Sequence, residues 1–221
     1  MKPLIIAIDG PSGAGKGTVA RAIASELGYR HVDSGAMYRA LAWKALVEEV
    51  ALDDDAAVAA LAARSQIHVS PEAVLIDRAE VTRAIRTPEI DRAAAAVARL
   101  PRVRAVLVAR QRRLGAGGGI VMEGRDIGTV VFPSADVKIY LDAAPEERAR
   151  RRAADVARAG GPSRVAEVET ALAARDELDR TRAASPLQAA ADATFIDTTG
   201  RTIEQVVTEV LAVVRSATGG Q

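Results

Sequence analysis

Short apolar runs alternate with longer stretches of helical period along most of the chain. The expected strands are Leu4–Ile8, Arg30–Asp33, Ile120–Met122, Val137–Leu141 and Thr194–Ile196. The expected helices are Lys16–Leu27, Ala36–Glu49, Asp54–Arg64, Pro88–Arg99, Val103–Arg113, Pro145–Ala159, Val165–Ser185 and Ile203–Val214. Strands that alternate with helices are typical of a parallel sheet wrapped by helices, so the pattern predicts an α/β fold.

Two places depart from this alternation. Gln66–Ser70, Ala73–Asp77 and Glu80–Val81 are short strand-like pieces separated by turns. They predict a small antiparallel patch within residues 65–86, inserted into a core formed by residues 1–64 and 87–221. Gly160-Gly161-Pro162 separates two arginine-rich helical stretches, either as an ordinary loop or as the hinge of a mobile lid at about residues 148–164.

Composition narrows the class of protein. A chain of 221 residues that is 49% hydrophobic and 27% charged fits one globular domain with small appendages. A net charge of +1 gives no global attraction to nucleic acid or membrane, and no apolar run approaches the roughly 20 residues that span a bilayer. The N-terminus does not resemble a signal peptide. We therefore expect a cytoplasmic monomer without nucleic acid or membrane partners.

Reactive and metal-binding side chains are scarce, whereas arginine is abundant. Cysteine is absent, which excludes disulfides, thiolate nucleophiles and zinc–thiolate sites, and two histidines are too few for a histidine-based metal site. Four of the 30 basic residues are lysines, which leaves 26 arginines. Either genomic bias explains this excess, or planar guanidinium groups are used to bind phosphate. The positions of the arginines decide between the two.

The strongest motif is a glycine-rich loop that follows the first strand and precedes the first helix. Its residues are Gly10, Pro11, Ser12, Gly13, Ala14, Gly15, Lys16, Gly17 and Thr18. Small residues let backbone N–H groups surround an anion, and the helix adds its positive end. Lys16 is expected to reach the β- and γ-phosphates of ATP, and Thr18 to support Mg²⁺. The motif therefore predicts a triphosphate site in a P-loop NTPase fold.

Three classes of protein use such a loop, and two of them fit poorly. A guanine-nucleotide switch reads its base with an Asn-Lys-x-Asp motif, but this chain contains no asparagine. A motor ATPase normally has an apolar strand that ends in Asp-Glu, whereas Ile120–Gly124 leads into Arg125-Asp126. A small-molecule kinase remains, and we expect the enzyme to be an ATP-dependent phosphotransferase.

The arginines favour an acceptor that already carries a phosphate. Such an acceptor is itself the nucleophile, so the obstacle is repulsion between anions, which guanidinium groups offset. Arg39 and Arg125 follow strands, where ligands of open α/β sheets bind. Further arginines lie on the expected lid and on the helix after it. They are Arg148, Arg151, Arg152, Arg158, Arg175 and Arg182.

Several blocks in the same order resemble bacterial cytidylate kinases over nearly the whole chain. They are Gly10–Thr18, Asp33-Ser-Gly-Ala-Met-Tyr-Arg39, Ile85-Arg-Thr87, Pro101-Arg-Val-Arg104, Glu123-Gly-Arg-Asp126 with Gly128-Thr-Val-Val-Phe-Pro133, and Arg175-Asp176 through Asp179-Arg180 and Arg182. The resemblance implies a P-loop kinase of three layers with a parallel central sheet, a helical lid and a small β-containing insert that binds the monophosphate. It also implies ATP and CMP or dCMP as substrates.

The resemblance also implies roles for individual residues. Ser34 and Asp126 accept hydrogen bonds from the cytosine amine, while Arg104 and Arg125 face the acceptor side of the base or the monophosphate. Arg39 and Arg175 hold the acceptor phosphate, Asp179 holds the sugar hydroxyls, and Tyr38 belongs to the same site. The residues expected to act on the transferring phosphoryl group are Lys16, Arg125, Arg148, Arg152, Arg158 and Arg182.

One position departs from the family pattern. Relatives carry a serine where this chain has Ala95, and that serine contributes to binding the acceptor sugar. The departure leaves the choice between CMP and dCMP open, because a neighbouring residue or a water molecule can substitute. Kinase activity on UMP or another small phosphorylated acceptor, and a non-catalytic nucleotide-dependent binding protein on the same fold, remain as alternatives.

Overall fold

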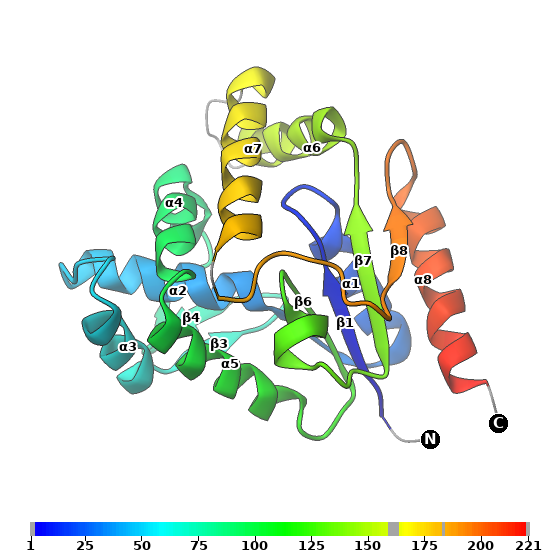
Figure 1. The fold of residues 1–221 in the computed structure, drawn as a ribbon, viewed down its shortest axis with the longest axis horizontal. Helices are drawn as coiled ribbons and strands as arrows, with labels where there is room; N and C mark the ends of the chain where they lie inside the picture. The colour runs from blue at the N-terminus through cyan, green and yellow to red at the C-terminus, as the bar shows by residue number, and fades with distance from the viewer. Residues whose placement is uncertain (1–2, 159–163, 183, 220–221) are drawn as a thin grey trace.

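A five-stranded parallel sheet forms the centre of the molecule (Figure 1). The computed structural model describes residues 3–158, 164–182 and 184–219, with the side chains of residues 156–158 and 218 outside the description. The strands are β1 (Ile5–Asp9), β2 (Arg30–Asp33), β6 (Ile120–Gly124), β7 (Val137–Asp142) and β8 (Thr194–Asp197). Their order is β2-β6-β1-β7-β8, so the loop after β1 emerges at the middle of the sheet.

Helices cover both faces of this sheet. Helices α1 (Lys16–Leu27) and α8 (Ile203–Thr218) pack on the face that carries Ile6 and Ile8. Helix α5 (Pro101–Gly115) and a π-helical segment at Ile127–Val131 pack on the opposite face, which carries Ala7. The alternation of side chains along β1 thus feeds two apolar layers. The predicted three-layer α/β fold is confirmed.

The predicted antiparallel patch is also confirmed. Strands β3 (Ile67–Val69), β4 (Val74–Ile76) and β5 (Ala79–Glu80) form a small antiparallel sheet, which is followed by a short 3₁₀ turn at Ala84–Arg86. This sheet packs its buried side chains against helix α2 (Ser34–Val47). The helices beside it are α2, α3 (Asp55–Arg64) and α4 (Pro88–Val97). They lie on the side of the molecule away from α8 (Figure 1).

Helices α6 (Pro145–Arg158) and α7 (Val165–Thr181) lie together beyond the carboxyl ends of the strands (Figure 1). The expected hinge Gly160-Gly161-Pro162 lies outside the described residues. Helix α7 ends at Thr181 rather than at the expected Ser185. The N–H of Leu187 donates to the carbonyl of Asp179 at 2.7 Å, which folds the chain back before the expected end. No helix in the described ranges is both long and apolar enough to cross a bilayer.

Candidate active site

The glycine loop lies between the central strand β1 and helix α1, as expected. Gly10, Gly13 and Gly15 have φ of 146°, 82° and 89°, a region that L side chains rarely adopt. A Cβ on Gly13 would lie 2.7 Å from the carbonyl oxygen of Arg148, and one on Gly10 would lie 1.9 Å from that of Leu141. Only glycine therefore allows this curled path at these positions.

Lys16 begins helix α1 and lies across the loop. Its Nζ donates to the carbonyl of Pro11 at 2.6 Å, and the side chain is buried. Burial, together with repulsion from Arg125, lowers the pKa of Lys16 to about 7. A bound triphosphate would add the negative charge that favours the protonated form.

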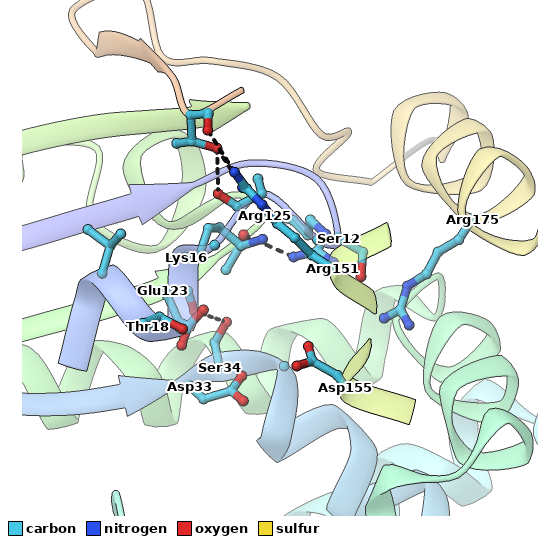
Figure 2. Close-up of a pocket in the computed structure, with 18 of the residues that line it drawn as sticks. Ser12, Lys16, Thr18, Asp33, Ser34, Glu123, Arg125, Arg151, Asp155 and Arg175 are labelled. Atoms are coloured by element: carbon cyan, nitrogen blue, oxygen red, sulfur yellow. Dashed lines mark hydrogen bonds between the residues drawn. The ribbon is translucent and has the colours of Figure 1, made fainter. Parts of the chain in front are cut away.

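A cavity of about 780 Å³ opens over the loop and extends to the arginine-bearing helices (Figure 2). It falls within the range of roughly 300–1,000 Å³ typical of ligand pockets. The expected site residues that line it are Ser12 to Thr18, Ser34, Tyr38, Arg39, Arg104, Arg125, Asp126, Arg175, Asp179 and Arg182. Gly10 and Pro11 support the loop from outside the lining. The structure thus brings together residues that the sequence places up to 170 positions apart.

Asp126 forms the centre of a buried charge network on the side of α5. Arg104 of α5 makes a close ion pair with its carboxylate, and an Nη of Arg182 lies 3.8 Å from it. The Arg104 guanidinium also lies over the ring of Tyr38, 5.8 Å from its centroid. These contacts hold the Asp126 carboxylate in one place at the cavity wall.

Ser34 lies beside this network at the start of helix α2. Its hydroxyl donates to the carbonyl of Glu123 at 2.7 Å. Since the proton is used there, the hydroxyl oxygen keeps lone pairs that can accept from an amine. Ala95, where relatives carry serine, also lines the cavity.

Asp179 of α7 joins the network to Arg125. Its carboxylate accepts from Nε of Arg125 at 3.0 Å and lies 3.7 Å from Arg182. Burial opposes ionisation, but Arg125, Arg175 and Arg182 outweigh it and hold the pKa of Asp179 below its usual value. Asp179 is therefore an anionic acceptor at the cavity wall.

Several buried guanidinium and hydroxyl groups at the cavity have atoms without a hydrogen-bond partner among the described residues. Nε of Arg39, Nε of Arg175, an Nη of Arg182 and the hydroxyl of Tyr38 are buried without a hydrogen-bond partner in the part of the chain that the structure describes. Arg175 extends from α7 toward the cavity (Figure 2). Buried donors of this kind are costly unless a ligand satisfies them, so the cavity suits an anion.

Two of the expected lid arginines are placed elsewhere. Arg148 is buried, pairs with Asp176 and donates to the carbonyl of Ser12 at 3.2 Å, so it supports the glycine loop from behind instead of lining the cavity. Arg152 pairs with Asp91 outside the lining. The side chain of Arg158 lies outside the described residues. Arg151, another of the expected lid arginines, does line the cavity, and so does Arg150, which sequence analysis did not single out.

Sequence analysis missed Asp9, at the end of β1. Its two carboxylate oxygens accept from the N–H groups of Ile127 and Gly128 at 2.8 and 2.7 Å. These bonds fix the segment that begins directly after Arg125 and Asp126. Burial raises the pKa of Asp9 to about 6. The sequence does contain a signal for this residue, because Asp9 directly follows the apolar run of the first strand.

Arg86 and Asp33 were also missed as individual site residues, although both lie inside the blocks of the resemblance. Asp33 accepts from Arg39 at 2.9 Å, lies 3.5 Å from Arg86, and caps helix α2 by accepting from the N–H of Ala36. Both line the cavity. Arg86 belongs to Ile85-Arg-Thr87, a block whose arginine the sequence reasoning left without a role.

Comparison with known proteins places the chain in a family. The cytidylate kinase family model matches residues 6–216. A cytidylate kinase of Desulfitobacterium hafniense is 50% identical over 96% of this chain and 92% of its own length, and one of Pelotomaculum thermopropionicum is 48% identical over 94% of each. A solved gluconokinase of Sinorhizobium meliloti shares the fold, with a TM-score of 0.52 and 17% identity over 99% of this chain and 96% of that one. The chain belongs to the cytidylate kinase family.

Proposed function

We propose that this enzyme transfers the γ-phosphoryl group of ATP to CMP or dCMP, which gives ADP and CDP or dCDP. The observation that supports this most strongly is one cavity that contains both the glycine loop and the guanidinium groups of Arg39, Arg125 and Arg175. A protein that only bound ATP would have no use for this second set of cations.

The donor is held by the loop from Gly10 to Thr18. Lys16 and the amide groups of the loop bind the triphosphate. The described residues contain no group of three or more His, Asp or Glu side chains that could hold a metal alone. This fits Mg²⁺, which prefers phosphate oxygens, water and few protein ligands. We propose that Thr18, which lines the cavity, supports the ion, and that Mg²⁺ when bound neutralises charge on the phosphates.

The acceptor lies between Asp126 and the arginines of α2 and α7. The Asp126 carboxylate and Ser34 hydroxyl accept from the exocyclic amine of cytosine, whereas the carbonyl of uracil would face two acceptors. Arg39 and Arg175 hold the acceptor phosphate, and Asp179 the sugar hydroxyls. Arg104 and Arg182 act through Asp126 and hold its carboxylate toward the base.

The reaction needs charge stabilisation and positioning more than acid–base chemistry. An oxygen of the acceptor phosphate attacks the γ-phosphorus, and the bond to the β–γ bridging oxygen breaks to release ADP. Lys16, Arg125 and Arg182 offset the negative charge of the two nucleotides and of the transferring group. We propose that the lid predicted at about residues 148–164, which begins within helix α6, closes over the bound nucleotides and excludes water.

A panel of acceptors tests this function. We expect the purified enzyme to release ADP from ATP rapidly with CMP or dCMP, more slowly with UMP or dUMP, and hardly at all without an acceptor. In Asp126→Ala the preference for CMP over UMP, as a ratio of kcat/KM, should shrink by about tenfold or more. Asp53→Ala, an exposed change outside the cavity, is the control. An unchanged ratio in Asp126→Ala would remove that residue from base recognition.

We further propose a monomeric enzyme that works in the cytoplasm on the pyrimidine nucleotide pool, with the division into core, lid and a 65–86 insert that the sequence predicts. Support comes from the soluble nature of both substrates and from a cavity built by a single chain. Light scattering of the purified protein at the concentrations used for kinetics would test the monomer.

A further inference from the structure

Asp91, on the first turns of helix α4, contacts guanidinium groups from three other helices. It makes a close ion pair with Arg152 of α6, lies 3.3 Å from an Nη of Arg175 on α7, and lies 3.9 Å from an Nη of Arg39 on α2. Burial opposes its ionisation, but Arg175, Arg152 and Arg39 outweigh that effect and hold the pKa of Asp91 below its usual value. The carboxylate is therefore an anion at neutral pH.

The charges around Asp91 do not balance. Arg39 and Arg86 share the second carboxylate of this cluster, Asp33, at 2.9 and 3.5 Å. Among the described residues, these contacts join four guanidinium groups to two carboxylates, an excess of two positive charges in the cluster. Asp179 also faces Arg175, but its charge is matched by Arg125 at 3.0 Å. A phosphate monoester carries a charge of about −1.5 to −2 at neutral pH. The excess matches the acceptor phosphate.

Asp91 contacts only one end of each guanidinium group of Arg39 and Arg175. Its ion pairs involve the Nη atoms of Arg39 and Arg175, while Nε of each is buried without a hydrogen-bond partner among the described residues. Both arginines line the cavity, whereas Asp91 lies behind them and outside the lining. Asp91 holds the guanidinium groups from the rear and leaves donors for a ligand in front.

We propose that Asp91 is a positioning residue that holds Arg39 and Arg175 at the acceptor phosphate site, and that its pairs with Arg175 and Arg152 tie helix α4 to helices α6 and α7 before nucleotides bind. This rests on the proposed function, in which Arg39 and Arg175 hold the acceptor phosphate. Without the Asp91 carboxylate, four guanidinium groups would share one anion, and their repulsion would separate the helices that carry them.

Steady-state kinetics test this role. In Asp91→Asn we expect the KM for CMP to rise about tenfold or more while the KM for ATP stays within about twofold, because the donor loop is not contacted. Asp91→Glu should recover part of the loss, since it restores the charge. Glu89→Gln, an exposed change on the same helix, is the control. A KM for CMP that is unchanged or lower, or an equal rise in both KM values, would overturn the proposal.

A distance measurement gives a readout that does not depend on turnover. Because the chain contains no cysteine, Glu89→Cys on α4 and Ala171→Cys on α7, both exposed, can carry a unique pair of spin labels. Without nucleotide, Asp91→Asn should broaden the distance distribution and lengthen its mean relative to the labelled parent. Superimposable distributions would contradict the proposed tie between the helices.

The two proposals fail in different ways. If the parent enzyme showed no CMP-dependent release of ADP, the proposed function would fall, whatever the spin labels report. If the parent turned over CMP normally and Asp91→Asn matched it in KM and in label distance, only the role of Asp91 would fall. Circular dichroism of each variant checks that it is folded.

Discussion

At the level of single residues, burial and neighbouring charges shift the pKa values of several ionisable groups at this site. Lys16 is buried beside Arg125, and burial with this repulsion lowers its pKa to about 7 in the nucleotide-free protein. Near neutral pH Lys16 is therefore only partly protonated, and a bound triphosphate would increase the protonated fraction. Binding of the donor should then be linked to uptake of a proton.

This linkage gives a prediction with a definite sign. The pKa of Lys16 is about 7 in the free protein and is expected to be higher with ADP bound, so at about pH 8 binding should take up a large part of one proton. Affinity should fall as pH rises above 7. Calorimetric titration with ADP in buffers of different ionisation enthalpy measures the proton count.

The Lys16→Ala variant is the control for that titration. It should bind ADP more weakly, take up no proton at the same pH, and lose phosphoryl transfer while its circular dichroism stays unchanged. Equal proton uptake by the parent and the variant would show that another group titrates, and full activity in the variant would refute the assigned role of Lys16.

Sequence reasoning located residues in motifs better than residues whose role depends on distant partners. Lys16 and Thr18 could be placed at the cavity because the glycine loop fixes their surroundings locally. The sequence could not show which of the lid arginines face the cavity and which do not. Arg148 is turned from the cavity by Asp176 on another helix, whereas Arg151 donates to Thr198 beside the loop. Asp91 carries no local signal at all, since its partners lie on three other helices.

At the scale of elements, the site depends on one strand end and one irregular helix. Most helices were predictable because local signals mark them, such as proline at the first turn of α4 and α5. The π-helical segment Ile127–Val131 was not, because the carboxylate that holds its first N–H groups belongs to Asp9, 118 positions earlier. Hydrogen bonds of that range are invisible to periodicity.

Removing the Asp9 carboxylate should therefore affect both stability and acceptor binding. In Asp9→Ala two buried N–H groups lose their acceptors, which should cost on the order of 3 kcal/mol of unfolding free energy and raise the KM for CMP. Asp9→Asn keeps one acceptor and should lose less. Urea unfolding with parallel kinetics measures both effects.

The pH dependence gives this prediction a second check. The pKa of Asp9 is raised to about 6 in the folded protein from 3.8, so the folded state holds the proton more tightly. Stability from this group is then present below about pH 4 and lost as pH rises through about 6. Asp9→Asn should lack that fall. A parent and variant with parallel stability profiles would show that Asp9 does not titrate as described.

At the scale of the whole molecule, the sheet brings distant arginines to one cavity. Arg39 follows the edge strand β2, Arg125 follows β6, and Arg175 lies on α7, yet all three line the same cavity as the glycine loop. Figure 2 shows Arg125 and Arg175 at this cavity. The parallel order β2-β6-β1-β7-β8 causes this, because the carboxyl ends of its strands meet at one edge. The order of the strands could not be predicted from the hydrophobic pattern. The gathering of site residues beyond the strand ends could, because these residues follow predicted strands.

If the cavity serves phosphoryl transfer between nucleotides, two anionic nucleotides must occupy it together. The most direct test is a calorimetric titration with adenosine and cytidine joined 5′ to 5′ through a pentaphosphate chain, which mimics both substrates at once. We expect one molecule to bind per chain, more tightly than ADP or CMP alone, and to compete with both. Two independent binding events, or a ligand that displaces ADP but leaves CMP bound, would contradict it.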